Sequence, residues 1–468
     1  MTTLGVIIGT RGFFPADLCE TGRKEILSVL EAEGIKPILL PLNATPRYGA
    51  IESLADAQKC ADLFKAHGEE IAGILVTLPN FGDERAVANA LRWAGLNVPV
   101  LIHAFNDDGK KMTIRHRRDS FCGKMSVCNN LRQYGISYTL TRQHTMDPAS
   151  KEFRADLRQF AATCNVVKKL KNVRLGALGA RPAAFNTVRY SEKLLERYGI
   201  SVTTVDLSEL LAKAGERDAK SIAVKAKLAE IKEYAPAPGV PAEKLLQMAR
   251  MGAVLTEWME ANELDATALQ CWTSVQQNLG CNVCTLMSMM SEKLMPSACE
   301  VDVTGVLTMY AMQLAAGSPA AIVDWNNNYG EDENKCVLFH CGNWAKSFLP
   351  GVKISNAPIL GSTLGVENTY GALDGRTPGN PLTYGRVTTA DAEGRIRAYL
   401  GEGELTDDPL DTFGSRAVAH IPRLQGLMEH VCRNGFEHHV VMTCSHSAAI
   451  LNEAFGNYFG WESYWHRA

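Results

Sequence analysis

The chain has 468 residues, of which 46% are hydrophobic and 21% are charged, as is usual for a globular protein with a large core. Its formal net charge of −3 gives no reason to expect a nucleic-acid or anionic-membrane partner, and no run approaches the ~20 apolar residues of a membrane span. At about 150 residues per domain, this length predicts roughly three domains.

The first third of the chain alternates strand-like and helix-like segments. Short β-prone runs at 4–8, 36–40, 71–77 and 98–102 are separated by helical stretches. This alternation predicts a parallel sheet with right-handed crossovers, and the loops at the carboxyl ends of its strands are where a ligand would bind.

Arg11 is the conspicuous side chain of the first such loop, Gly9–Gly12. A guanidinium at this place can bind a hydroxyl-rich or anionic ligand through its planar fork of donors, or it can be an ordinary surface arginine. The loop has no GxGxxG pattern, so the sequence gives no support to dinucleotide binding. A basic run at 110–118 reads most simply as a solvated face.

A second alternating segment begins near residue 173. Strands are expected at 173–180, 201–205 and 265–270, and the last of them ends beside Gln270 and Trp272. Helical stretches separate these strands, so we expect a second parallel sheet.

The last third of the chain changes character after Trp344. Glycines and prolines recur and short β segments replace long helices, which predicts a small antiparallel barrel or sandwich over about 350–430. The predicted fold is therefore α/β. It has two consecutive Rossmann-like parallel-sheet domains, at 1–165 and 166–345, and a mostly antiparallel β domain at 346–468.

The cysteine content indicates a reducing compartment. The chain has 13 cysteines, and its first residues, Met1–Ile8, lack the basic segment and cleavage site of a secretory signal. We therefore expect a cytoplasmic protein with reduced thiols. Cys281 and Cys284 have CxxC spacing, but a zinc site needs a second pair at suitable spacing, so we expect buried structural thiols there.

Two carboxylates follow apolar runs in the middle of the chain. Glu300 comes after Ser297-Ala-Cys, and Asp324 comes after Ala321-Ile-Val. An ionised carboxylate in such surroundings needs a cation or several hydrogen-bond donors. Asp302 would share a face with Glu300 in an extended segment, so it is an alternative to that residue.

Three histidines extend this set. His340 ends an apolar run, and the pair His438 and His439 opens another. Adjacent residues of a strand point to opposite faces, so only one histidine of the pair is expected to enter a shared site. Oxygen ligands together with one imidazole suit a divalent cation such as Mn²⁺ or Mg²⁺ better than Zn²⁺.

These residues carry a resemblance to a known family. The carboxylates Glu300 and Asp324, followed by His438-His-Val-Val-Met-Thr-Cys-Ser-His446, resemble the metal-binding segments of the L-fucose isomerase and L-arabinose isomerase superfamily. Gly9-Thr-Arg-Gly12 is similar to the Gly-x-Arg opening of the fucose-type enzymes, and the turns over 371–387 look like the family's C-terminal β domain. The likeness spans most of the chain, through short and scattered motifs.

The resemblance implies a metal site and an activity. Glu300, Asp324 and His439 would hold Mn²⁺, with Mg²⁺ or Co²⁺ as alternatives, and the two carboxylates would share the proton transfers of catalysis. The activity would be aldose–ketose interconversion of a hexose, pentose or deoxy sugar through a cis-enediol(ate). His340 lies near another histidine ligand of the arabinose-type enzymes, and His446 matches the family's later histidine.

Further side chains are expected to contact the sugar. The resemblance implies that Arg11 faces the substrate, and that it acts across a subunit boundary in a homo-oligomer, a trimer or hexamer. Arg11 and the basic run at 110–118 together allow an anionic sugar such as sulfoquinovose. The other candidate contacts, each with structural packing as the alternative, are Gln270, Trp272, Asn326, His340 and Trp344.

Two other functions fit the same fold. One is a non-catalytic sugar-binding or sensing protein, and the other is a metal-dependent sugar epimerase. The carboxylate pair favours the enzymes, since binding a neutral sugar needs no ion-binding pair, and only reaction products separate an isomerase from an epimerase.

Overall fold

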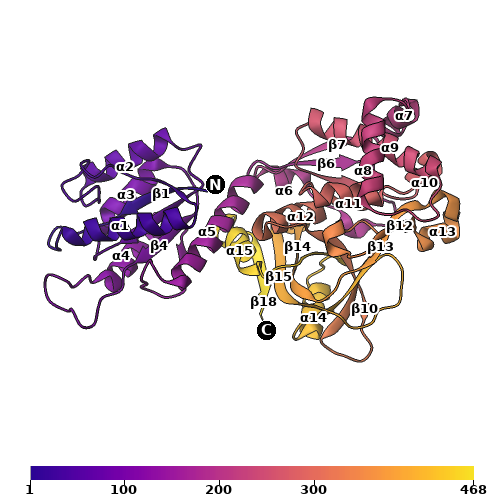
Figure 1. Ribbon diagram of the computed structural model, residues 1–468. Coiled ribbons are helices and arrows are strands. Elements are labelled where there is room, and N and C mark those ends of the chain that lie inside the picture. Colours follow the sequence, from indigo (N-terminus) through magenta and orange to yellow (C-terminus); the bar gives the residue numbers. More distant parts are fainter. Residues whose placement is uncertain (1, 468) are drawn as a thin grey trace. The chain divides into compact units, whose positions relative to one another are not determined.

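The computed structural model describes residues 2–467, which form two compact units (Figure 1). The N-terminal unit holds the chain up to Lys168 together with Asn457–Phe459, and the C-terminal unit holds Lys169–Gly456 and the segment that begins at Gly460. No helix among the described residues is long and apolar enough to cross a bilayer.

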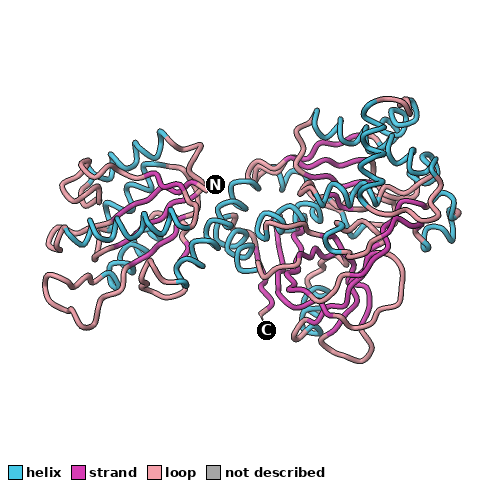
Figure 2. Tube along the Cα trace, in the orientation of Figure 1, coloured by secondary structure: helices cyan, strands magenta, loops and turns pink. Residues whose placement is uncertain are grey.

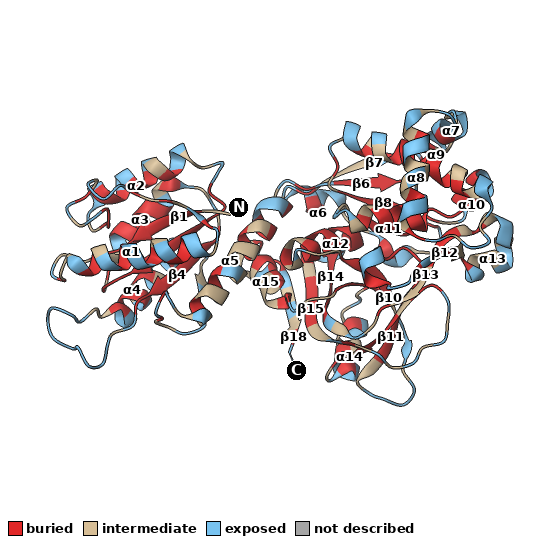
Figure 3. Cartoon of the chain, viewed as in Figure 1, coloured by how far each residue is buried: buried red, intermediate tan, exposed pale blue. Residues whose placement is uncertain are grey.

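A five-stranded parallel sheet, in the order β2-β1-β3-β4-β5, forms the centre of the N-terminal unit. Its middle strands, β1 (Thr3–Ile8) and β3 (Gly73–Leu78), are almost entirely buried, as expected for a sheet covered by helices on both faces (Figure 3). The parallel sheet predicted for the first third of the chain is confirmed. The other elements are β2 (Lys36–Ile38), β4 (Val100–Ala104), β5 (Thr139–Leu140), α1 (Asp17–Ala32), α2 (Leu54–Ala66), α3 (Glu84–Ala94), α4 (Ser120–Gln133) and α5 (Lys151–Leu170).

A second parallel sheet, in the order β7-β6-β8-β9, opens the C-terminal unit. Its strands are β6 (Arg174–Leu178), β7 (Ser201–Val205), β8 (Ala266–Leu269) and β9 (Ser297–Ala298). Its helices are α6 (Glu192–Glu196), α7 (Leu207–Glu216), α8 (Ile222–Tyr234), α9 (Ala242–Ala261), α10 (Ser274–Leu279), α11 (Cys284–Glu292) and α12 (Val303–Ala316), with a 3₁₀ turn η1 at Asn186–Val188. The second predicted parallel sheet is thus also confirmed.

The remaining strands form a nine-stranded sheet that closes on itself (Figure 2). Because β15 pairs with both β14 and β16, the six strands β16-β11-β10-β17-β14-β15 make a closed ring in which every neighbour is antiparallel. Closure leaves none of these six strands with a free edge. The strands are β10 (Ala321–Asn328), β11 (Lys335–His340), β12 (Lys353–Asn356), β13 (Tyr370–Arg376), β14 (Asn380–Ala390), β15 (Arg395–Thr406), β16 (Ser415–His420), β17 (His439–Thr443) and β18 (Glu462–His466).

The barrel begins earlier in the chain than the sequence suggests. β10 and β11 precede Trp344, yet both are members of the closed ring. The helices that follow are α13 (Pro358–Leu364), α14 (Leu424–Arg433) and α15 (Ala448–Asn452), with short 3₁₀ turns η2 (Lys346–Phe348), η3 (Val366–Asn368) and η4 (Asp391–Glu393) and a π-helical turn η5 (Glu453–Tyr458). The division of the chain into three domains stays a prediction.

One continuous core joins the second parallel sheet to the barrel. A single cluster of buried side chains includes Leu178 and Leu269 from the sheet and Val323, Leu338 and Tyr384 from the barrel. Helix α12 is buried on nearly every side and contacts β8, β14 and β17. A helix that is apolar all round belongs in an interior, and here it lies between the two layers.

The segment around Glu300 is a tight turn, which corrects the extended run expected from the sequence. β9 ends at Ala298, the turn has φ +57° at Glu300 and φ +55° at Val301, and α12 begins at Val303. Residues with positive φ interrupt a strand, so Glu300 and Asp302 do not alternate along one strand face.

Candidate active site

A cavity of about 510 Å³ opens in the C-terminal unit where the second parallel sheet meets the barrel. Its walls come from the segments that follow β6, β8 and β9, from β10 and β11, from α13 and from the start of β17. The residues that line it are Phe185, Trp272, Glu300, Asp324, Trp325, Asn326, Phe339, His340, Cys341, Ile359, Leu360, His438 and His439.

Strand pairing in the barrel brings Asp324 and His439 together. Asp324 on β10 lies directly opposite His439 on β17, and opposite Phe339 of β11 on its other side. Residues that are paired across antiparallel strands have neighbouring side chains. Two residues that lie 115 positions apart in the chain therefore meet at one wall of the cavity, as the predicted metal site requires.

Glu300 reaches the cavity from the strained turn before α12. A positive φ at two successive non-glycine residues is costly, and more so at the β-branched Val301. The turn is held by backbone hydrogen bonds from Val301 N–H to Leu269 O (3.3 Å) and from Asp302 N–H to Cys299 O (3.0 Å). Backbone strain of this kind persists where the surrounding structure holds it in place, and here it fixes the position of the Glu300 carboxylate.

His439 is the predicted metal ligand that links the other two, because it lies in one cluster with Glu300 and His340 and in another with Asp324 and His438. Nε2 of His439 lies 3.8 Å from Oε2 of Glu300 and 3.5 Å from Oδ1 of Asp324. Glu300 is only 4% exposed, and its Oε2 has no hydrogen-bond partner among the described residues. Burial raises the pKa of Glu300 above its ordinary value. A buried carboxylate oxygen without a donor, facing an imidazole nitrogen, is the arrangement that a divalent cation would satisfy.

The orientation of His439 is fixed by a chain of buried charges. Its Nδ1–H donates to Oδ2 of Asp302 over 2.8 Å, so the lone pair of the neutral ring lies on Nε2. Arg386 donates to both oxygens of Asp302, at 2.6 and 2.7 Å, and its Nε lies 3.2 Å from Glu437. Arg386 is fully buried, and its charge holds the pKa of Asp302 far below the ordinary value despite burial. A carboxylate behind a ligand histidine is the usual partner of a metal-binding imidazole.

The ring of His340 makes the opposite hydrogen bond to that of His439, because its Nδ1 accepts a hydrogen bond where Nδ1 of His439 donates one. Its Nδ1 accepts a hydrogen bond from the backbone N–H of Cys341 at 3.0 Å, and its Nε2 lies 3.7 Å from Oε2 of Glu300. In the neutral ring the proton is therefore on Nε2 and points toward Glu300. Of the two buried histidines, His439 is the one whose free lone pair faces the carboxylates.

His438 stands at the rim of the cavity. Its Nε2 lies 3.5 Å from Oδ1 of Asp324, and its ring meets Phe185 edge to face. Partial burial lowers the pKa of His438. His439 is buried and His438 is exposed, yet both rings line the cavity and both lie 3.5 Å from Asp324. Both histidines of the pair therefore reach this site, whereas the sequence led us to expect only one.

The predicted sugar contacts are divided between the cavity and other places. Trp272 and Asn326 line the cavity, and Nε1 of Trp272 donates to Oε1 of Glu300 over 2.8 Å. Gln270 borders a separate cavity of about 600 Å³ and accepts a hydrogen bond from Ala180 N–H. Trp344 is 1% exposed and donates its indole N–H to Ile322 O, so it is a core residue away from the cavity wall.

Two further candidates are not among the residues that line this cavity. Arg11 belongs to the N-terminal unit, where it donates to Gly82 O, pairs with Glu84 and stacks over the ring of Phe81 at 4.1 Å. His446 lies 3.2 Å from Glu404 on the exposed side of the barrel. Their roles stay predictions.

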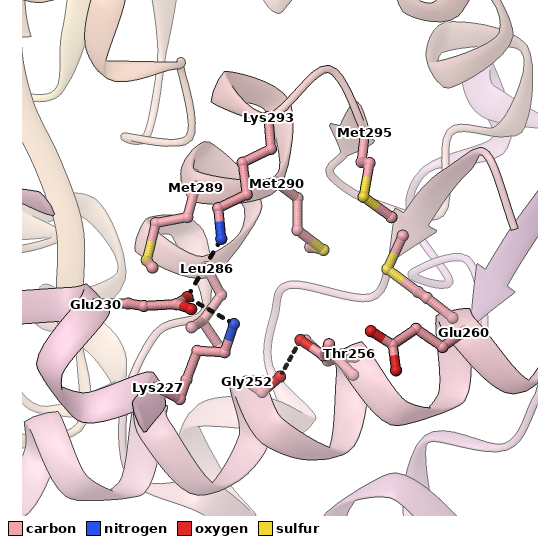
Figure 4. A pocket seen from close by; sticks show the side chains of 12 residues that line it. Lys227, Glu230, Gly252, Thr256, Glu260, Leu286, Met289, Met290, Lys293 and Met295 are labelled. Atoms are coloured by element: carbon pink, nitrogen blue, oxygen red, sulfur yellow. Dashed lines mark hydrogen bonds and ion pairs between the residues drawn. The ribbon is translucent and has the colours of Figure 1, made fainter. Parts of the chain in front are cut away.

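A third cavity, of about 330 Å³, is apolar and differs in chemistry (Figure 4). Lys227 and Lys293 both pair with Glu230 at its edge, and the side chains of four methionines enter it. Its methionines are Met259, Met289, Met290 and Met295. No histidine is among the residues that line this apolar cavity. Of the two, only the 510 Å³ cavity combines carboxylate and imidazole groups that suit a metal.

Comparisons with known proteins point to one family. Residues 5–171 match the fucose/sulfoquinovose isomerase N-terminal domain, and residues 338–466 match the L-fucose isomerase C-terminal domain. The sulfoquinovose isomerase of Priestia aryabhattai is 24% identical over 445 residues, which is 94% of both chains. Those of Clostridium sp. (strain MSTE9) and Alkalicoccus urumqiensis are 25% and 24% identical over 69% and 74% of this chain, and 71% and 76% of theirs. The chain belongs to the fucose isomerase-like superfamily.

Members of the fucose isomerase-like superfamily that match this chain are isomerases, so the protein is an enzyme that interconverts an aldose and a ketose. The two matched domains contain Arg11 and His439 respectively, whereas Glu300 and Asp324 lie between residues 171 and 338, which neither of these two matches covers.

Sequence reasoning missed the groups that support the site. Asp302 was considered only as an alternative carboxylate, while Arg386 and Glu437 were not singled out at all. A signal was present, because Arg386 lies in a run of apolar and small residues, where a charge needs a buried partner. The partner could not be named, since Arg386 lies 84 positions from Asp302 in the sequence.

Proposed function

We propose that this isomerase requires a divalent cation, Mn²⁺ in preference to Mg²⁺ or Co²⁺, held by Glu300, Asp324 and His439, and that its substrate is a sulfonated aldohexose, sulfoquinovose. The observation that carries the metal site is the partnerless oxygen of Glu300, which faces the free nitrogen of His439. Oxygen-rich ligation with one imidazole favours Mn²⁺ over Zn²⁺.

The chemistry of the proposal is a proton transfer between neighbouring sugar carbons. A bound cation would act as a Lewis acid on the two adjacent sugar oxygens. The proton leaves C2 and returns to C1, while the hydroxyl proton moves from O2 to O1. We assign these transfers to Glu300 and Asp324 jointly.

The surrounding side chains assist in distinct ways. Trp272 keeps Oε1 of Glu300 engaged through its indole N–H, which leaves Oε2 directed into the cavity. The rings of Phe185 and Trp272, which meet edge to face at 5.5 Å, form an apolar wall that limits water around the reacting carbons. Asn326 offers an amide for a sugar hydroxyl.

The choice of a sulfonated sugar rests on the relatives and on arginine chemistry. The matched full-length relatives are sulfoquinovose isomerases. The residues that line the cavity, within the described part of the chain, include no lysine or arginine, so the sulfonate needs a cation from elsewhere. We assign this contact to Arg11, whose guanidinium fork suits an anionic oxygen group.

Assembly and location complete the proposal. The enzyme is a homo-oligomer, a trimer or hexamer, in which the N-terminal unit supplies Arg11 to the active site of a neighbouring chain. It works in the cytoplasm, and the fact that all thirteen cysteines are free supports a reducing compartment.

The proposal is tested by stripping the protein with a chelator, adding Mn²⁺ and following ketose formation from sulfoquinovose, L-fucose and L-arabinose. We expect no turnover in the stripped protein, recovery with Mn²⁺ and a preference for sulfoquinovose. Turnover of neutral sugars alone would remove the sulfonated substrate, an epimerised aldose as product would favour an epimerase, and full activity without metal would remove the metal site.

A further inference from the structure

Four free cysteines gather behind the proposed active site. Cys299 directly precedes Glu300, Cys341 directly follows His340, and Cys271 and Cys284 adjoin them. All four thiols are free, and only Cys341 is partly accessible, at the cavity wall. The sulfur atoms of Cys299 and Cys341 and a ring nitrogen of His340 lie within 4.8 Å of one another.

We propose that Cys299, Cys341 and Nδ1 of His340 form a second metal site, specific for a thiophilic divalent cation such as Zn²⁺. Two thiolates and an imidazole are ligands that Zn²⁺ prefers, whereas Mn²⁺ prefers oxygen. With Zn–S bonds of about 2.3 Å, two tetrahedral sulfur ligands lie ~3.8 Å apart, so the observed grouping needs only a small contraction.

The ring of His340 is already oriented for this role. Its Nδ1 accepts the N–H of Cys341, so it carries the ring's free lone pair, and it lies 3.5 Å from the Sγ of Cys341. Metal binding at Nδ1 would use this lone pair and break the hydrogen bond from the Cys341 N–H. Its Nε2 faces the carboxylate of Glu300 at 3.7 Å. A metal-bound histidine usually directs its second nitrogen at a carboxylate, and Glu300 occupies that place.

The sulfur of Cys299 has polar contacts that suit a thiolate ligand. Nδ2 of Asn343 donates to it over 3.3 Å, and this side chain is 2% exposed. The thiol of Cys271 donates to Oε1 of Glu300 over 3.5 Å, and these two groups lie within 4.8 Å of the sulfur of Cys299. Either Cys271 or Cys284 can complete four-coordination, and binding releases one proton from each thiol that becomes a ligand.

This site would oppose the metal chemistry of the active site. Glu300 would be shared between the proposed Mn²⁺ and the imidazole of the thiol site. Two divalent cations so close together repel each other, and a contraction of Cys299 toward Cys341 would move Glu300, its neighbour in the chain. Occupation of the thiol site is therefore inhibitory, although its existence does not depend on the proposed function.

The test is a Cd²⁺ titration that follows the ultraviolet charge-transfer band of thiolate–Cd²⁺ bonds. Exposed thiols would contribute to it, so the background protein carries Cys122→Ser and Cys432→Ser. We expect one equivalent of Cd²⁺ to saturate the band, Zn²⁺ to displace it and Mn²⁺ to leave it unchanged. The band should persist in Asp324→Asn, which separates this site from the proposed Mn²⁺ site.

Cys341→Ser and Cys299→Ser should each weaken Cd²⁺ binding by about tenfold or more. Cys336→Ser is the matched control, because this buried thiol lies on the same strand as His340 but outside the cluster, and it should leave the band unchanged. Should Cys299→Ser fail to fold, Cys341→Ser alone decides the question. Absence of the band at one equivalent, an undiminished band in Cys341→Ser, or equal loss in Cys336→Ser would overturn the proposal.

Discussion

His439 donates its Nδ1–H to Asp302 over 2.8 Å, and this contact leaves Nε2 as the nitrogen that faces Glu300 and Asp324. Asp302 in turn is bound by Arg386 through both carboxylate oxygens. It also caps α12 by accepting the N–H of Gly305 at 2.8 Å. The start of one buried helix thus fixes the ring of a histidine that comes from the far end of the chain.

The Asp302–His439 contact predicts a loss of metal affinity in Asp302→Asn. The amide is neutral, so the imidazole loses the anionic partner that orients it and raises its basicity, and we expect Mn²⁺ to bind about 10–100-fold more weakly. Calorimetric Mn²⁺ titration measures this.

Asp374→Asn is the control for this variant, because Asp374 also pairs with an arginine, Arg416, but at a site away from the cavity. Since Asp302→Asn removes a partner from a buried arginine, a thermal melt must first show that it is folded. A folded Asp302→Asn protein with wild-type Mn²⁺ affinity would contradict the supporting role of this carboxylate.

Glu300→Gln should separate catalysis from folding. The glutamine keeps the shape of the side chain and can still accept the indole N–H of Trp272, but it cannot move a proton, so we expect kcat to fall by about 10²–10⁴-fold. In metal-free protein the melting temperature should not fall, since a buried carboxylate oxygen without a partner is removed. Retention of wild-type kcat would exclude Glu300 from the proton transfer.

Arg11→Met should discriminate between sugars. If Arg11 binds the sulfonate, KM for sulfoquinovose should rise by about tenfold or more, while turnover of neutral sugars should change little. Its ion pair with Glu84 is partly exposed and contributes little to stability. Arg92→Met, which removes a guanidinium stacked on Tyr134 in the same unit, is the control. Equal losses for sulfonated and neutral sugars would assign Arg11 to another role.

Lys124 makes the stability of the N-terminal unit depend on pH. It is fully buried, donates to Thr141 and to His144 O, and burial lowers its pKa to about 8. The unfolded chain has a lysine pKa of about 10.4. Between these two values the unfolded state binds more protons than the folded state, so this lysine's contribution to stability increases as pH rises from about 8 to about 10.4.

Lys124→Met should abolish this increase, while Lys168→Met, which alters an exposed lysine of the same unit that donates to Glu69 O, should keep it. The measurement is the free energy of unfolding of each variant relative to wild type across that pH range. An identical pH dependence in Lys124→Met and wild type would refute the effect.

The sequence predicted those features that depend on residues close together in the chain. Alternating strands and helices predicted both parallel sheets, and the apolar runs that precede Glu300 and Asp324 and follow His439 predicted buried ligands. Asp324 lies opposite His439 because of the register in which β10 and β17 pair. The hydrophobic pattern along one strand does not determine which residue of another strand it faces.

What escaped prediction depends on long-range packing. The closed ring requires β15 to pair with β16 as well as β14, and no local signal distinguishes that from an open sandwich. The turn at Glu300 reads as a strand because Val301 and Val303 are β-prone, and tertiary contacts override that preference. Trp344 looked like a ring-face contact, yet its indole fills the core.

The most direct test of the central claim is anomalous diffraction from crystals of the Mn²⁺-loaded protein. We predict one strong anomalous peak per chain at the manganese edge, within bonding distance of Nε2 of His439 and of carboxylate oxygens of Glu300 and Asp324. A peak bound to other residues, or no peak in crystals of protein that is active with Mn²⁺, would contradict the claim that these three side chains hold the catalytic ion.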